Sequence, residues 1–400
     1  MKKKFLALLL SLMFVFSICV NAADFSFKKG DVINQNSRSY IEFSKLSDYG
    51  LKTEKKGTSY TISDGNATLV FKENSSVFTV NNTPFTMDTK TIGKKNELLI
   101  PLRILFETLN YKVGWNKNTK SIAVEKLAEN KLPVKANDYT ITKHHNKVVS
   151  LAPSVTETFF DLGAEKMLLG RSEYCNYPKA ALSLPSVGSL KEPSLEKIVS
   201  LKPTAVIAQT HYKEEVLNEL KKANIEVIAM DTPKTMEETY EIIKKIGLIL
   251  DKNYEARALC STMNAKLETV AMKTKKLSKP SVYIVVGTGQ YGEYTHGKDS
   301  FMNGILTVAG YTNAPTDAEG FSYTLEKLIQ KDPYYILTPS FATEAVKTEK
   351  AYKGLSAVKN GRVIEIDADI FSRPSRRVVD DGLKVLLKIA HPEILKTLEF

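Results

Sequence analysis

Two segments of this chain, 130 residues apart, share one pattern: residues 194–203 and residues 324–333. Each opens with a hydroxyl residue suited to cap a helix, places a glutamate (Glu196 or Glu326) in the first turn and continues with apolar residues at helical spacing. Each ends at a proline that precedes an apolar run typical of a buried strand. The repeat predicts two similar lobes, each presenting one acidic side chain at an equivalent place. Such a pair suits docking onto a partner with two-fold symmetry.

The first 23 residues have the features of an export signal. Three lysines precede an apolar stretch over residues 5–18, and the small residue Ala22 follows at a suitable cleavage position. The stretch is too short for a typical membrane span. Residues 1–23 are therefore predicted to be a signal peptide that exports the protein to the outer face of the membrane or the cell wall. Cys19 is a candidate for lipid attachment, but the bulky Ile18 before it disfavours lipidation.

The charge of the chain argues against nucleic acid as a partner. The formal net charge is +11. The positive residues are mostly lysines interleaved with Asp and Glu, without the basic and aromatic stripe of a nucleic-acid groove. The pattern favours a solvated basic surface attracted to an anionic cell envelope.

Residues 24–127 alternate short apolar strands with turns, which indicates a small β-rich (α+β) domain. Its closing stretch contains Pro101-Leu102-Arg103 and Val113-Gly114-Trp115. These motifs resemble the copper amine oxidase N-terminal-like domain of exported bacterial proteins. No His-x-His pair for copper is present. The domain is therefore expected to be a stalk or a module that binds the cell wall or a partner.

Residues 128–145 form a polar connector, predicted to be a solvated linker, with residues 143–145 as a less favoured metal-binding tract. From residue 146 strands alternate with helices, which indicates covered, mostly parallel sheets. The predicted fold class is therefore α/β, with two doubly wound lobes at residues 146–250 and 280–400. A single helix over residues 251–279 joins them as a stiff hinge.

Within the first lobe, Ser154 and Glu157 have the spacing of a capping box, which predicts a helix that begins there. Cys175 and Cys260 remain after the predicted signal peptide. They either pair in an oxidising compartment or, as their wide separation favours, remain two independent buried thiols. Only two histidines, His211 and His296, fall near the cleft expected between the two lobes, so no metal or other cofactor is predicted.

Ordered motifs over residues 146–393 resemble the cobalamin and ferric-siderophore class of ABC-transporter substrate-binding proteins. These motifs are Val148–Glu157, Tyr174–Pro178, Pro185–Gly188, the unit from Ser194 to Pro203, His296–Phe301, Ala309–Asn313 and Arg373–Arg377. The resemblance implies a monomeric receptor without catalytic activity that carries a cobalamin-like corrinoid or a ferric siderophore to an ABC permease dimer. It also implies that Glu196 and Glu326 pair with arginines of that permease. Stabilisation of the helix dipole would explain each glutamate singly, but not their shared register.

The ligand is expected between the lobes, on loops that leave the carboxyl ends of the strands. These loops are rich in aromatic residues, which suits a large ring-containing ligand, although core packing is the alternative for each aromatic side chain. The predicted contacts are Ser154, Tyr174, Tyr177, Leu190, Lys191, His211 and Tyr212 in the first lobe, and Tyr291, Tyr294, Phe321, Tyr323, Asp369, Phe371 and Arg373 in the second.

Three of the eight arginines, Arg373, Arg376 and Arg377, lie within five positions at the expected cleft edge. They either contact an anionic group of the ligand, with Arg373 favoured, or form ion pairs within the lobe with Asp380 or Asp381. The only tryptophan lies outside both lobes, and Leu190 stands where corrinoid-binding members of the class often place one. This departure weakens the corrinoid assignment.

Three alternatives remain open. The first is a haem receptor of the same class. The second is a scaffold or adhesion protein of the cell wall with no transport role. The third is an exported enzyme, which is disfavoured because the chain has no Gly-x-Ser-x-Gly elbow, no phosphate-binding loop and no His-Glu-x-x-His motif.

Overall fold

The computed structural model describes residues 25–28, 30–116, 121–129, 131–136, 139–209, 213–288, 292–318 and 320–400. The predicted signal peptide and Cys19 lie outside these ranges, as do His211, Tyr212 and Tyr291. No helix among the described residues combines the length and the apolar character needed to cross a membrane.

The N-terminal domain consists of antiparallel sheets, in the strand orders β1-β12-β11, β2-β3-β10-β9 and β4-β5-β6-β7-β8. Its elements are β1 (Phe25–Ser26), β2 (Val32–Gln35), β3 (Arg38–Glu42), the 3-10 helix η1 (Phe43–Tyr49), β4 (Lys52–Lys56), β5 (Ser59–Ser63), β6 (Thr68–Lys72), β7 (Val77–Val80), β8 (Thr83–Thr86), β9 (Ile92–Lys94), β10 (Glu97–Pro101), α1 (Leu102–Thr108), β11 (Tyr111–Asn116) and β12 (Ser121–Lys126). Alternating buried side chains, such as Tyr60 and Ile62 on β5, place one face of that strand in the core.

The prediction of a solvated linker over residues 128–145 is wrong for its second half. Strands β13 (Val134–Ala136) and β14 (Tyr139–Ile141) form an antiparallel hairpin that packs on the first lobe. Ile141 is fully buried, and the buried His145 ring contacts the Thr204 hydroxyl at 3.1 Å. The hairpin was missed because its apolar residues are few and its exposed side chains are polar.

The first lobe has a parallel sheet in the order β16-β15-β17-β18. Its elements are β15 (Val148–Ser150), α2 (Pro153–Asp161), the 3-10 turns η2 (Glu165–Met167) and η3 (Lys179–Ser183), β16 (Leu168–Arg171), α3 (Leu195–Ser200), β17 (Ala205–Gln209), α4 (Glu214–Lys222), β18 (Glu226–Met230) and α5 (Met236–Ile249). Alternate residues of β17 point to opposite faces: Val206 packs with α3 and α4, whereas Ile207 packs with α2 and α5. Helices thus cover both faces, as the continuous apolar strands predict.

The second lobe has a mixed sheet in the order β22-β20-β19-β23-β24, with β21 also pairing with β19. Its elements are β19 (Ser281–Gly287), β20 (Glu293–Thr295), α7 (Phe301–Val308), β21 (Thr312–Asn313), β22 (Ser322–Tyr323), α8 (Leu325–Lys331), β23 (Tyr335–Thr338), α9 (Ser340–Thr348), α10 (Ser356–Lys359), β24 (Val363–Glu365), α11 (Ala368–Phe371), the π-helical turn η4 (Val378–Gly382), α12 (Leu383–Ala390) and α13 (Pro392–Leu395). The sheet is again covered on both faces, by α8 and α9 on one and by α7 and α12 on the other. The predicted fold class is confirmed.

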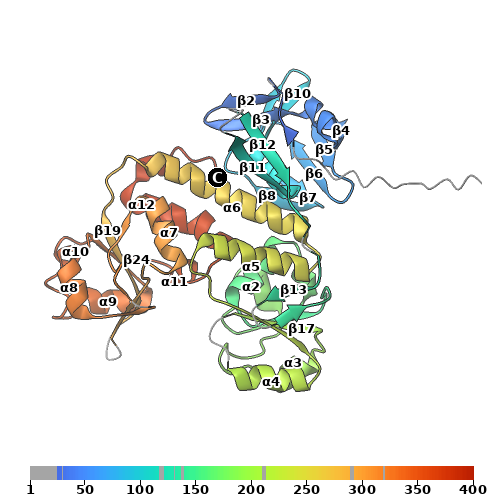
Figure 1. The fold of residues 1–400 in the computed structure, drawn as a ribbon. Coiled ribbons are helices and arrows are strands. Elements are labelled where there is room, and N and C mark those ends of the chain that lie inside the picture. The colour runs from blue at the N-terminus through green and yellow to red at the C-terminus, as the bar shows by residue number, and fades with distance from the viewer. Residues whose placement is uncertain are drawn as a thin grey trace, which may run out of the picture.

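One helix, α6 (Asn253–Thr274), joins the lobes and is shorter than the segment 251–279 predicted for it. Figure 1 shows α6 running between the blue and cyan N-terminal domain and the two lobes. Leu259 and Met263 on α6 belong to one continuous apolar core that includes residues of all three domains. The N-terminal domain is therefore packed against the hinge helix.

Polar contacts reinforce this packing. The buried Asp88 carboxylate accepts hydrogen bonds from Arg38 and, at 2.6 Å, from the Thr269 hydroxyl on α6. A second contact reaches the first lobe at Gly163, where a Cβ atom would lie 2.7 Å from the Thr83 hydroxyl oxygen. Gly163 also has a positive φ of 64°, so both its backbone and its close neighbour require glycine.

We expect Asp88→Ala to destabilise the protein by about 3 kcal/mol, because it leaves the largely buried Arg38 guanidinium without its carboxylate. Urea unfolding of the full chain measures the loss. Glu54→Ala is the control, since Glu54 pairs with Lys56 at 2.8 Å on the exposed surface and its removal should cost less than about 1 kcal/mol. Equal losses in the two variants would show that the polar contact does not hold the domain on α6.

Candidate functional site

The two repeated segments adopt the same local structure. Ser194 and Thr324 cap helices α3 and α8, and their hydroxyls accept hydrogen bonds from the backbone N–H three residues later at 3.3 and 3.2 Å. Glu196 and Glu326 are both exposed in the first turn. Within the part of the chain that the structure describes, neither carboxylate forms an ion pair. Figure 1 places α3 and α8 in different lobes, both remote from the N-terminal domain.

The predicted ligand contacts fall into distinct environments. Tyr174 and Phe321, from opposite lobes, are 51% and 42% exposed. Tyr177, Leu190, Tyr294 and Asp369 are half-buried, and Lys191 is exposed. Ser154, Tyr323 and Phe371 are buried, and the last two belong to the apolar cores, as the core-packing alternative expects. The aromatic side chains most available at the surface are thus Tyr174 and Phe321.

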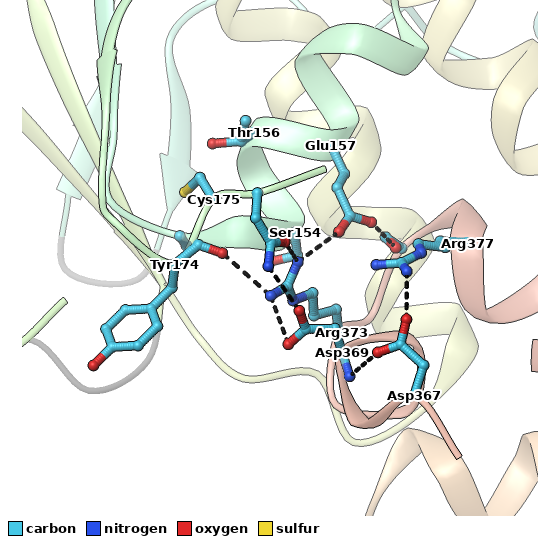
Figure 2. A network of polar contacts seen from close by, with 12 residues as sticks. Ser154, Thr156, Glu157, Tyr174, Cys175, Asp367, Asp369, Arg373 and Arg377 are labelled. Carbon is cyan, nitrogen blue, oxygen red and sulfur yellow. Dashed lines mark hydrogen bonds and ion pairs between the residues drawn. The ribbon is translucent and has the colours of Figure 1, made fainter. Parts of the chain in front are cut away.

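Arg373 lies at the junction of the two lobes, where it is buried. One terminal nitrogen donates to Asn176 at 2.7 Å and to Glu157 on α2 at 3.3 Å. The other donates to the Tyr174 carbonyl at 3.2 Å and pairs with Asp369 at 2.7 Å. Figure 2 shows the Tyr174 ring pointing away from this network while its carbonyl faces Arg373. The Arg373 guanidinium therefore joins the lobes in this structure, and its contact with a ligand stays a prediction.

The other two arginines extend this junction. Arg376 pairs with Asp161 of the first lobe at 2.8 Å and with Asp380 at 3.5 Å. Arg377 pairs with Asp367 at 2.8 Å, and its guanidinium lies 4.3 Å from the centre of the Tyr177 ring. The predicted ion pairs within the lobe are therefore present, from Arg376 to Asp380 and from Arg377 to Asp381 at 4.0 Å, but the contacts across the lobes were not anticipated.

Glu157, a partner of Arg373, was predicted to be a capping residue because the predicted start of helix α2 was wrong. Helix α2 begins at Pro153, two residues after Leu151, so Ser154 lies inside the first turn and does not cap it. Its hydroxyl donates instead to Gln209 at 2.5 Å. Glu157 does not form the predicted capping box, and its carboxylate accepts a hydrogen bond from the Ser375 hydroxyl at 2.5 Å. Burial raises the pKa of Glu157, and the Ser375 hydrogen bond and the charge of Arg373 oppose that shift.

Burial has the same effect on Asp161. It raises the pKa of Asp161 to about 7, against the opposing charge of Arg376. Two carboxyls of one helix, Glu157 and Asp161, therefore meet two arginines of the other lobe. Both ion pairs cross from one lobe to the other, so they belong to the lobe arrangement seen here.

The next question is whether the remaining described residues could hold a metal ion. No group of three or more His, Cys, Asp or Glu side chains suited to a metal occurs among the described residues. Cys175 and Cys260 are free buried thiols, which confirms the favoured alternative. His296 is 3% exposed and its ring lies 5.4 Å from that of Phe321, measured between ring centres.

His296 predicts a loss of stability in acid. Burial lowers its pKa from 6.5 to about 4, so the unfolded chain takes up a proton in this window that the folded protein does not. The contribution of His296 to the free energy of unfolding is fully present above pH 6.5, and it falls by about 3 kcal/mol as the pH drops to 4. Urea unfolding across this range should show a weaker pH dependence for His296→Gln. The same change at the exposed His144 should leave it unaltered, and an unaltered slope in His296→Gln would contradict the assignment.

Comparison with known proteins identifies both parts of the chain. The family model described as "Periplasmic binding protein" matches residues 148–370, and that described as "Copper amine oxidase N-terminal domain" matches residues 19–124 and 79–156. An uncharacterized ABC transporter substrate-binding lipoprotein, YvrC of Bacillus subtilis, is 32% identical over 267 residues, which are 65% of this chain and 84% of the relative.

Two further proteins agree with these matches. The vitamin B12-binding protein of Salmonella typhi is 27% identical over 236 residues, covering 58% of this chain and 86% of that protein. The crystal structure of a periplasmic heme binding protein from Pseudomonas aeruginosa aligns with a TM-score of 0.56 at 25% identity, covering 62% of this chain and 93% of that one. The chain thus belongs to the periplasmic binding protein family, whose relatives here include ABC transporter substrate-binding proteins, and carries a copper amine oxidase N-terminal domain ahead of its binding lobes.

Proposed function

We propose that this protein captures a cobalamin-like corrinoid or a ferric siderophore outside the cytoplasm and delivers it to an ABC importer. The observation that carries the proposal is the pair of exposed glutamates, Glu196 and Glu326, which occupy the same position on matched helices in different lobes. Two equivalent acids suit the two subunits of a symmetric permease with basic residues at its surface. Charge of this kind directs orientation and speeds association more than it adds affinity.

The ligand would bind between the lobes against Tyr174 and Phe321, with Tyr177 and Tyr294 at their sides. Exposed aromatic rings from opposite lobes offer a large, rigid apolar contact to a macrocycle or a chelate. The half-buried Leu190 supplies an aliphatic contact and the exposed Lys191 a cation for an anionic group of the ligand. No catalytic step belongs to this function.

Haem is the second candidate ligand. One similar solved structure is that of a heme binding protein, and the exposed Tyr174 offers a phenol, a group that can ligate haem iron. The receptor would work as a monomer on the outer face of the membrane, whether released after signal cleavage or held there by lipid.

We expect visible-absorbance titration of the full chain with cyanocobalamin, haem and ferric citrate to reveal stoichiometric binding of one of them. Glu196→Lys with Glu326→Lys should bind the same compound normally but lose its uptake into cells, because the charge reversal repels the permease without altering the cleft. The matched control is Glu214→Lys with Glu344→Lys, which reverses one charge per lobe on other helices. Normal uptake by the first variant, or no binding of any of the three compounds, would refute the proposal.

The N-terminal domain is proposed to bind the cell wall. Trp115, 62% exposed, and Met272 of α6, 51% exposed, both line a groove of about 340 Å³. The groove also contains the ion pair of Arg103 and Glu268 at 3.4 Å. It therefore combines an aromatic side chain with hydrogen-bond donors and acceptors, and this pair adds no net charge. Such a surface suits the uncharged, hydroxyl-rich sugar rings of a wall polymer.

Sedimentation with purified cell-wall sacculi tests this role. Trp115→Ala should lower the affinity for sacculi about tenfold, because an exposed aromatic anchor supplies much of the contact energy of such surfaces. Tyr334→Ala removes an aromatic side chain of 45% exposure from the second lobe and should leave sedimentation unchanged. Equal sedimentation of wild type and Trp115→Ala would contradict wall binding through this groove.

A further inference from the structure

The matched helices share more than a glutamate. Val199 and Ile329 each follow the glutamate by three residues, and their side chains are 46% and 48% exposed. Branched aliphatic side chains thus stand in the solvent at the same position of the repeat in both lobes.

These side chains are not needed for the core. The preceding residues, Ile198 and Leu328, already anchor the two helices and are 0% and 1% exposed. On a helix, residues three apart are surface neighbours, with their Cβ atoms about 5–6 Å apart. Each helix therefore presents an acidic and an aliphatic side chain next to each other, and this pair occurs twice.

A single exposed aliphatic residue needs no explanation, because such residues are common on protein surfaces. The repetition is different. The two helices cover different sheets and contact different cores, so packing does not force the same exposed residue type into the same register. The position adjoins the carboxylate in both lobes, which points to the same partner.

We propose that each lobe docks through a two-part surface, Glu196 with Val199 in the first and Glu326 with Ile329 in the second. The partner is the ABC permease dimer of the proposed function, on which this inference rests. Each permease subunit would then present a cationic side chain beside an apolar hollow. A partner that offered charge alone would leave Val199 and Ile329 in water.

The two parts have different physical roles. The carboxylates attract the permease over distance and orient the receptor, an effect that salt screens. Burial of the aliphatic side chains excludes water at short range and slows dissociation, which salt does not screen. The aliphatic pair would keep the complex together at the ionic strength outside the cell.

Crosslinking tests the contact directly. A photoreactive benzophenone amino acid replaces Val199, Ile329 or, as the control, Val77 in the full chain expressed in its own cells. Val77 is also a branched aliphatic residue, 44% exposed, but it lies on β7 of the N-terminal domain. Probes at 199 and 329 should both attach to one membrane protein that mass spectrometry identifies as an ABC permease subunit, and the probe at 77 should not. Absence of that adduct from both helices would overturn the inference.

Affinity gives the second readout. Val199→Ser with Ile329→Ser should weaken binding of the full chain to the purified permease in nanodiscs about tenfold, mainly through faster dissociation, with Val77→Ser unchanged. If the serine variant binds like wild type while Glu196→Lys with Glu326→Lys does not bind, the aliphatic contact is refuted and docking through charge stands. If the lysine variant also binds like wild type, the proposed docking function itself fails.

Discussion

The enclosure of α6 is the constraint on which the rest of this structure depends. The helix has buried residues on every side, because the N-terminal domain covers one flank and the two lobes cover the others. A helix in this position needs partners for most of its buried polar groups. Ser261 does so with Glu107 of the N-terminal domain at 2.8 Å, and Lys266 with Asp380 of the second lobe at 2.5 Å. The three domains are thus fixed relative to one another through one element.

This enclosure limits how the lobes can move. A receptor that closes widely around its ligand needs a flexible connection, whereas here the connection is a packed helix and the lobes are further joined by Arg373 with Glu157 and Arg376 with Asp161. Opening the lobes would break both of these contacts and expose the freed groups to water, although Arg373 would keep Asp369 and Arg376 would keep Asp380 within the second lobe. Capture of a solute would then depend mainly on side chains and loops at the cleft.

The sequence could predict what repeats or lies close together along the chain. The caps Ser194 and Thr324 and the exposed Glu196 and Glu326 follow from local pattern, and the structure has them at those positions. The local pattern misled at the start of α2, where the helix begins at Pro153 and Glu157 is a partner of the other lobe rather than a capping residue, and it also missed the hairpin of β13 and β14.

Contacts between distant segments were beyond prediction for a physical reason. Thr269 and Arg38 are 231 residues apart, and neither has a neighbour in sequence that signals the other. An N-terminal domain that stood apart from α6 as a stalk would have the same sequence pattern of strands and turns. The packing of this domain on the hinge helix is therefore a property of tertiary structure, visible only when α6 and the domain are seen together.

The fixed placement of the domains has a consequence for the proposed roles. Trp115 lies beside α6, while Glu196 and Glu326 lie on helices remote from the N-terminal domain (Figure 1). The proposed wall-binding and permease-docking surfaces therefore do not overlap, so engagement of one leaves the other accessible. Because α6 connects both regions rigidly, a receptor held by the wall would keep its glutamates turned away from the point of attachment. That orientation favours contact with a permease on the opposite side.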